Sequence, residues 1–173
     1  MIDIEKYFRN FFKGTKNPSL NAMIFFMEKY NNFETNMKFI HIAGTNGKGS
    51  CTEILTNSLV KQGYRVGKFL SPHLIKYNER ISINNNNITD EEMEVLINEL
   101  NPVIEEYEKK FGEKITLFEL ETIMGLIYFY RNKIDFVILE TGLGGLYDCT
   151  NIISKPLVSI ITSIRIRSYA NIR

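Results

Sequence analysis

Apolar residues recur at helical spacing in several segments, and these segments alternate with short apolar runs that are typical of buried strands. Helices are expected over residues 3–12, 19–30, 48–62, 89–111 and 116–130. Strands are expected over residues 38–43, 64–70, 134–140 and 156–162, with 77–83 as a further extended segment. Strands that alternate with helices predict an α/β fold, in which a parallel sheet is flanked by helices and ligands gather at the carboxyl ends of the strands.

The longest predicted helix carries its own start and stop signals. Thr89 stands three residues before Glu92, as in a capping box, and Gly112 follows the last apolar position. Pro102 lies inside the pattern, so the helix is expected to be continuous, kinked or split in two. The four asparagines at 84–87 predict a polar turn before it.

Composition narrows the class of protein. The 173 residues are 44% hydrophobic and 24% charged, which is ordinary for a soluble globular domain with a real core. Lys and Arg (21) nearly balance Asp and Glu (20), so the charge gives no case for nucleic acid or an anionic membrane as partner. The chain shows no signal-peptide pattern and no apolar run of about 20 residues. We expect a cytoplasmic monomer in which Cys51 and Cys149 are packing residues.

The segment 38–50 points most directly to a ligand. An apolar strand ends in Gly44-Thr45-Asn46-Gly47-Lys48-Gly49-Ser50, and a helical pattern begins at once. Glycines let backbone N–H groups approach phosphate oxygens, the helix N-terminus favours an anion, and Lys48 adds a positive charge. Gly49 separates Lys48 from Ser50, so the loop is a variant of the usual phosphate-binding pattern, and a turn that binds nothing is the alternative. The pattern predicts a cradle for the phosphates of a nucleotide.

Glu140 closes the apolar strand at 134–140 and stands just before the glycine-rich loop Gly142-Leu143-Gly144-Gly145. P-loop proteins hold Mg²⁺ beside the phosphates with a carboxylate in such a position, and the ion takes oxygen ligands. We therefore interpret Glu140 as a metal ligand. A solvated glutamate at a strand end is the alternative.

Five motifs follow one another along the chain. They are Gly44-Thr45-Asn46-Gly47-Lys48-Gly49-Ser50, Ser71-Pro72-His73-Leu74, Asn78-Glu79-Arg80-Ile81, Phe118-Glu119-x-x-Thr122 and Glu140-x-Gly-Leu-Gly-Gly-x-x-Asp148-x-Thr150-Asn151. In this order and spacing they resemble folylpolyglutamate synthase and dihydrofolate synthase, ATP-dependent amide-forming enzymes of the Mur ligase superfamily. The resemblance covers residues 1–164, which implies part of an N-terminal, P-loop-type ATP-binding domain; the C-terminal glutamate-binding domain has no counterpart.

The resemblance implies a reaction and its site. ATP would convert a substrate carboxylate into an acyl phosphate, which the amine of L-glutamate then attacks. The phosphates of ATP would lie on Gly44 to Ser50, with Mg²⁺ held by Ser71 and Glu140; Lys48 and Glu140 are the expected catalytic residues. A flexible loop around Asn78-Glu79-Arg80 would border the cleft for the substrate. Folate or dihydropteroate would meet Thr15, Lys16, Asn17, Thr116, Leu117, Phe118, Glu119, Tyr147, Asp148 and Cys149.

The chain departs from the family pattern at two places. Leu146 stands where the family commonly has arginine, and after Ile164 the family continues Gly-x-Asp-His, whose histidine completes the metal site. With AT-rich codons, reading residues 165–173 one base later recovers that motif. We interpret this tail as frameshifted and expect the shortened chain to be inactive. The alternatives are an ATP-binding fragment without catalysis and a Mur ligase of peptidoglycan precursors, although the second, third and fifth motifs favour folate.

Overall fold

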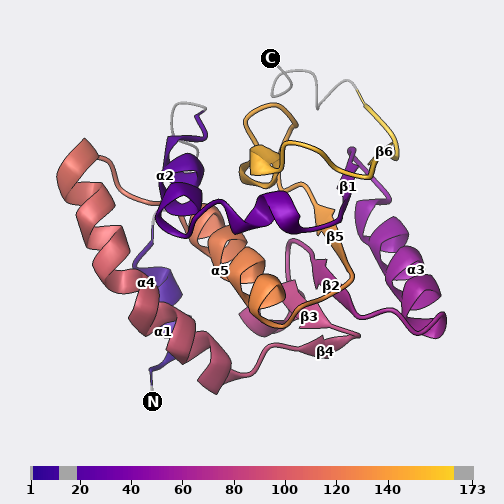
Figure 1. Cartoon of the computed structure of the whole chain (residues 1–173), viewed down its shortest axis with the longest axis horizontal. Helices are drawn as coiled ribbons and strands as arrows, with labels where there is room; N and C mark the ends of the chain where they lie inside the picture. Colours follow the sequence, from indigo (N-terminus) through magenta and orange to yellow (C-terminus); the bar gives the residue numbers. More distant parts are fainter. Residues whose placement is uncertain (1, 12–18, 166–173) are drawn as a thin grey trace.

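The computed structural model describes residues 2–11 and 19–165, which form one sheet with helices on both faces (Figure 1). The helices are α1 (Ile4–Arg9), α2 (Asn21–Lys29), α3 (Lys48–Lys61), α4 (Asp90–Phe111) and α5 (Leu117–Arg131), with three short 3-10 helices η1 (Phe33–Asn36), η2 (Tyr77–Arg80) and η3 (Cys149–Ile152). The strands are β1 (Phe39–Ala43), β2 (Val66–Phe69), β3 (Ile81–Ile83), β4 (Asn86–Asn87), β5 (Phe136–Glu140) and β6 (Val158–Ile161). Every predicted helix and strand is thus present.

The six strands are ordered β4-β3-β2-β5-β1-β6. Strands β2, β5, β1 and β6 are parallel, which confirms the predicted sheet, whereas β3 and β4 extend its edge as an antiparallel hairpin. The hairpin turn consists of Asn84 and Asn85, whose φ angles are 50° and 65°. Asparagine tolerates this left-handed conformation better than most residues. The predicted polar turn over 84–87 is thus confirmed for Asn84 and Asn85, whereas Asn86 and Asn87 form β4.

The extended segment predicted over 77–83 is wrong in its first half, because Tyr77–Arg80 forms η2 and only Ile81–Ile83 is a strand. The Glu79 carboxylate accepts hydrogen bonds from the backbone N–H groups of Leu74, Ile75 and Lys76, at 2.7, 2.9 and 2.9 Å. Because of these bonds, the backbone of residues 74–76 curves around the Glu79 side chain. In this structure, Glu79 thus organises a turn in the segment where the family resemblance implies a flexible loop.

Helix α4 is continuous through Pro102, so it is not split in two there. Its capping box is formed: the Thr89 hydroxyl accepts from the Glu92 N–H, and the Glu92 carboxylate accepts from the Thr89 N–H. Gly112 ends the helix in the left-handed conformation, with φ of 67°. Within the described ranges, no helix combines the length and apolar character that crossing a bilayer requires.

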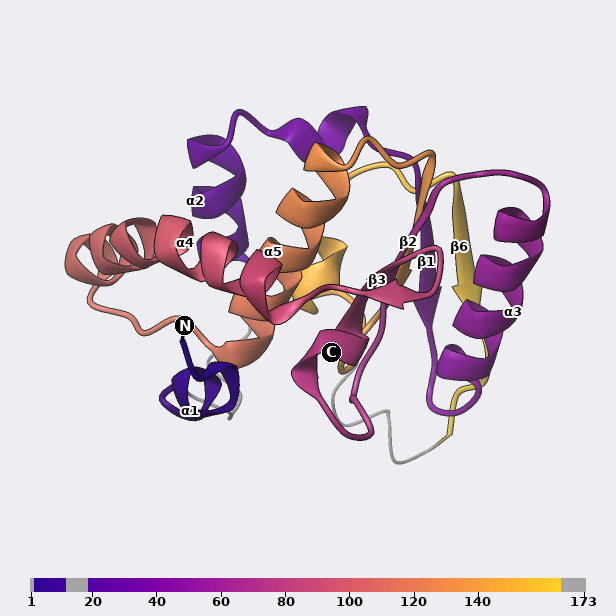
Figure 2. The ribbon, with the colours of Figure 1, turned by 90° about the horizontal axis from the view of Figure 1, so that it is seen from below.

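The helices cover the two faces of the sheet unequally. Helix α3 lies alone on one face, whereas α2, α4 and α5 pack on the other (Figure 2). The smaller core under α3 is centred on Ile42, Val66 and Ile138, and the larger core surrounds α5. Both cores fix the strands whose carboxyl ends carry the predicted site.

Candidate functional site

Three predicted site segments meet at one edge of the sheet. The loop 44–50 follows β1, Ser71 comes two residues after β2, and Glu140 is the last residue of β5. Strand β5 lies between β2 and β1 and is parallel to both. Because parallel strands end at the same edge, the sheet order brings these segments together although almost 100 residues separate the first from the last.

The glycine-rich loop opens onto the N-terminus of α3. Gly47 is the N-cap residue with φ of 84°, a left-handed conformation that favours glycine, and no side chain caps the helix. The first backbone bond of the helix runs from the Cys51 N–H to the Gly47 carbonyl at 3.0 Å. The N–H groups of Lys48, Gly49 and Ser50 precede this bond, so they have no carbonyl acceptor within the helix. They form a site suited to an anion.

Lys48 and Glu140 line this site. The Lys48 ammonium donates to the Gly44 carbonyl at 3.0 Å and lies 3.9 Å from Oε1 of Glu140. Burial raises the pKa of the Glu140 carboxyl to about 7, against the opposing effects of Lys48 and a backbone hydrogen bond from Ser71. Gly49 is close by, since a Cβ placed on it would lie 3.8 Å from Oε2 of Glu140. The carboxylate therefore faces the first turn of α3.

The donor set suits a magnesium ion. Glu140 is only 4% exposed, and its raised pKa shows that the charges around it do not fully balance the ionised form. A divalent cation at this carboxylate would supply the missing positive charge, and Ser71 adds a hydroxyl oxygen in the adjacent loop. Within the described ranges, no cluster of three or more His, Cys, Asp or Glu residues is arranged to hold a metal. Phosphate oxygens and waters would complete the coordination of an ion held by Glu140 and Ser71.

Known proteins resemble this chain in sequence and in structure. No protein-family model matches the chain. It is 43% identical over 148 residues to the dihydrofolate synthase/folylpolyglutamate synthase of Bacillus subtilis, covering 85% of this chain and 34% of the relative. It is 39% identical over 164 residues to the enzyme of the same name from Buchnera aphidicola subsp. Baizongia pistaciae, covering 92% and 36%.

Solved structures agree with these sequences. Folylpolyglutamate synthase from Thermotoga maritima matches with a TM-score of 0.88 and 35% identity, over 96% of this chain and 38% of that one. The chain belongs to the folylpolyglutamate synthase and dihydrofolate synthase family. The Mycobacterium tuberculosis folylpolyglutamate synthase complexed with ADP matches with a TM-score of 0.86 and 29% identity, over 94% and 36%. The chain thus spans about a third of the length of the relatives it matches.

The family's Phe118-Glu119 motif begins α5. Thr116 and Glu119 form the capping box of this helix, since the Glu119 carboxylate accepts from the Thr116 N–H at 2.6 Å and the Thr116 hydroxyl accepts from the Glu119 N–H at 3.2 Å. Leu117 is buried. The Phe118 ring packs under Gly142, where an added Cβ would lie 2.5 Å from it. Of these four predicted substrate residues, Phe118 thus connects the start of α5 to the loop that follows β5, whereas Thr116 and Glu119 cap the helix.

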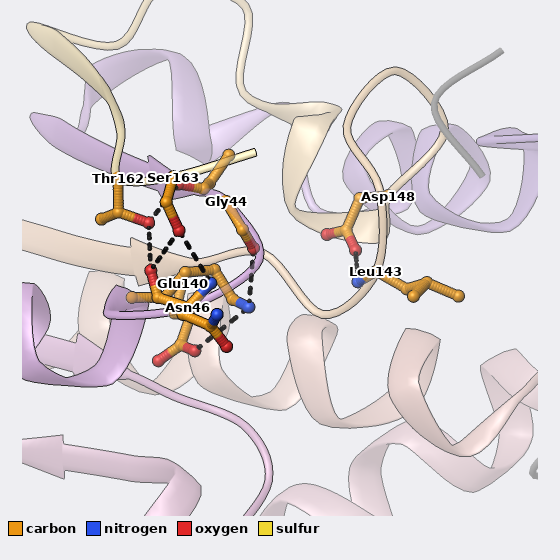
Figure 3. Close-up of polar contacts among 9 residues, drawn as sticks. Gly44, Asn46, Glu140, Leu143, Asp148, Thr162 and Ser163 are labelled. Carbon is orange, nitrogen blue, oxygen red and sulfur yellow. Dashed lines mark hydrogen bonds and ion pairs between the residues drawn. The ribbon is translucent and has the colours of Figure 1, made fainter. Parts of the chain in front are cut away.

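The family's Gly-Leu-Gly-Gly loop is held by Asp148. One carboxylate oxygen accepts from the Leu143 N–H at 2.8 Å (Figure 3), and the other accepts from the Thr150 N–H and hydroxyl at 3.0 and 2.6 Å. Tyr147 is 48% exposed and Cys149 is half-buried. Asp148 therefore shapes the loop from inside, while Tyr147 faces outward. The remaining predicted substrate residues, Thr15, Lys16 and Asn17, lie outside the described residues.

The sequence alone gives no role to His41, Thr162 or Glu121. His41 Nε2 lies 2.8 Å from the Thr150 hydroxyl, so β1 supports the loop around Asp148. Glu121 forms a buried ion pair with Arg80 at 2.6 Å. Thr162 lies against the glycine-rich loop. All these contacts join residues far apart in the chain, and no local motif marks them.

Proposed function

We propose that this chain is the nucleotide-binding part of an ATP-dependent ligase, a folylpolyglutamate or dihydrofolate synthase. The observation that carries the proposal is the uncapped N-terminus of α3, which faces the buried carboxylate of Glu140 beside Lys48. The phosphates of ATP would bind to the loop 44–50, with Lys48 moving from the Gly44 carbonyl to the terminal phosphates. The structure of M. tuberculosis folylpolyglutamate synthase with ADP supports this assignment of the ligand.

Glu140 and Ser71 would hold the Mg²⁺ that accompanies the nucleotide. A bound Mg²⁺ screens the negative charge of the phosphates during transfer. The protein's own part is to place Glu140 within reach of the first turn of α3 and to keep it dehydrated, which strengthens its attraction for a cation. Besides the Mg²⁺, Lys48 adds a second positive charge, since its ammonium lies 3.9 Å from the Glu140 carboxylate.

The whole protein would join L-glutamate to folate or dihydropteroate. A carboxylate is a poor electrophile, so its conversion to an acyl phosphate by ATP is what allows the glutamate amine to attack. The names of the relatives support these substrates, as does a solved complex of folylpolyglutamate synthase with AMPPCP and folate, which matches with a TM-score of 0.84 and 28% identity. The exposed Tyr147 and the half-buried Phe118 at the start of α5 are the proposed contacts of the pterin-bearing substrate.

Calorimetric titration of the 173-residue chain with ADP, with and without Mg²⁺, tests the nucleotide site. We expect binding that Mg²⁺ strengthens, a loss of about tenfold or more in affinity for Lys48→Met, and loss of the Mg²⁺ effect for Glu140→Gln. Lys61→Met is the matched control, because Lys61 is an exposed lysine in the last turn of the same helix. Absence of ADP binding, or equal losses for Lys48→Met and Lys61→Met, would contradict the proposal.

The ligase reaction is tested separately. The locus is sequenced past residue 164 and expressed to the length of the relatives, and ADP release is measured with L-glutamate. Release that depends on folate or dihydropteroate supports the synthase. Release with a muramyl precursor instead would assign the protein to the peptidoglycan branch of the superfamily.

A further inference from the structure

Thr162 and Ser163, which follow β6, form several hydrogen bonds with the glycine-rich loop (Figure 3). The Thr162 hydroxyl donates to the Asn46 carbonyl at 2.7 Å and lies 3.3 Å from the Ala43 carbonyl. The Ser163 carbonyl accepts from the Thr45 N–H at 2.6 Å, and the Ser163 hydroxyl lies within 3.3 Å of both the N–H and the carbonyl of Asn46. Residues 43–46 are therefore held from one side by Thr162 and Ser163.

Gly44 shows how closely the two segments approach. Its φ angle is 139°, and a Cβ added to it would lie 2.2 Å from the Thr162 hydroxyl oxygen. A glycine is needed here because Thr162 occupies the space that a side chain would fill. By contrast, among the residues that the structure describes, a Cβ on Gly47 would come within 4 Å of the Thr162 Cβ alone, at 3.9 Å. Gly44 thus allows the close contact with Thr162, whereas the described residues would leave room for a Cβ at Gly47.

The bond to Asn46 has a directional consequence. A trans peptide group is planar, so its carbonyl and its N–H point in opposite directions. When Thr162 holds the Asn46 carbonyl, the N–H of Gly47 in the same peptide group is turned away from Thr162. Ser163 also occupies the N–H groups of Thr45 and Asn46. The backbone N–H groups that remain available to an anion then begin at Gly47. They continue into the first turn of α3, which no side chain of the described residues caps.

We infer that Thr162 is a positioning residue for the phosphate cradle: its hydroxyl fixes the Asn46–Gly47 peptide so that the Gly47 N–H faces the anion site. This inference rests on the proposed nucleotide function. Without the Thr162 hydroxyl, the Asn46 carbonyl loses the shorter of its two hydrogen bonds and keeps the 3.2 Å contact with the Ser163 hydroxyl. The peptide is then less firmly oriented, and the cradle loses one aligned donor. Ser163 assists, because its hydroxyl lies 3.2 Å from the same Asn46 carbonyl.

The test compares two substitutions of Thr162 by calorimetric titration with ADP and Mg²⁺. Thr162→Val removes the hydroxyl at nearly constant shape, and we expect the affinity to fall on the order of tenfold. Thr162→Ser keeps the hydroxyl and should bind within about twofold of the unsubstituted chain. Thr56→Val is the control, because the Thr56 hydroxyl bonds to the Thr52 carbonyl inside α3 and does not contact the loop.

The outcomes are distinct. Equal affinities for Thr162→Val and the unsubstituted chain, or equal losses for Thr162→Val and Thr162→Ser, overturn the inference while leaving the nucleotide site intact. Failure of the unsubstituted chain to bind ADP overturns the proposed function, and the inference with it. Thermal unfolding of each variant separates a lost fold from a lost cradle. If Thr162→Val does not fold, Thr162→Ala takes its place, and an ADP affinity of Thr162→Ala equal to that of the unsubstituted chain overturns the inference.

Discussion

Replacing Arg80 with methionine should lower the free energy of unfolding by about 3–5 kcal/mol, because it leaves the Glu121 carboxylate buried without its arginine. Nη1 of Arg80 lies 2.6 Å from Oε2 of Glu121, and the two side chains are only 13% and 3% exposed. Nε of the same guanidinium donates to Nδ1 of His73 at 2.9 Å. Arg80 thus connects α5 to the loop that carries Ser71, and methionine replaces its bulk but neither interaction.

A second ion pair has the same distance between its charged atoms but is more exposed, so it shows how burial alone changes the effect on the free energy of unfolding. Lys29 and Glu106 also lie 2.6 Å apart, but their side chains are 41% and 49% exposed. Water screens such a pair and solvates whichever partner is left alone. Lys29→Met should therefore change the free energy of unfolding by no more than about 1 kcal/mol.

Urea unfolding at pH 7, followed by circular dichroism, measures both variants. A loss of about 3–5 kcal/mol is a large part of the 5–15 kcal/mol that typically stabilises a domain, so the midpoint should shift clearly. The double variant Arg80→Met/Glu121→Leu should recover most of the loss, because it removes the buried charge as well as its partner. A loss below about 1 kcal/mol for Arg80→Met, or a double variant no more stable than the single one, would refute the reasoning.

Three further predictions concern stability. Gly67→Ala should cost about 1–3 kcal/mol, because its Cβ would lie under 3 Å from side chains of Ile134 and α5, whereas Gly145→Ala, with nothing within 4 Å, should be nearly neutral in the same thermal unfolding assay. Thr116→Ala removes half of a capping box and should cost about 0.5–2 kcal/mol, measured by urea unfolding; a neutral result would show that α5 does not need the cap. Burial lowers the pKa of His41 below 6.5, against a smaller opposing effect of Asp148, so the stability that neutral His41 contributes is complete above pH 6.5 and is lost as the pH falls through its folded pKa. Between pH 7.5 and 5, the wild-type chain should therefore lose more stability than His41→Gln, and parallel profiles would contradict this.

Local signals in the sequence were sufficient for most element boundaries. The capping boxes at Thr89 and Thr116 are formed as their spacing predicts, because both partners lie within one helical turn. Residues 77–80 were predicted as extended and are helical, because the Glu79 carboxylate gathers three N–H groups that precede it. Apolar periodicity carries no information about such a side chain to backbone contact.

The sequence by itself determined the α/β fold and the family. It also predicted that the glycine-rich loop and Glu140 lie at one edge of the sheet, since parallel strands end at a common edge, and the family resemblance added Ser71. It did not determine that β5 lies between β1 and β2, nor that β6 lies beside β1. The position of β6 beside β1 decides that Thr162 reaches the Asn46 carbonyl, and the packing of α5 against β2 decides that Glu121 reaches Arg80. Such contacts span 116 and 41 residues along the chain. They exist only after the strands and helices have packed, and for that reason only the tertiary structure decided them.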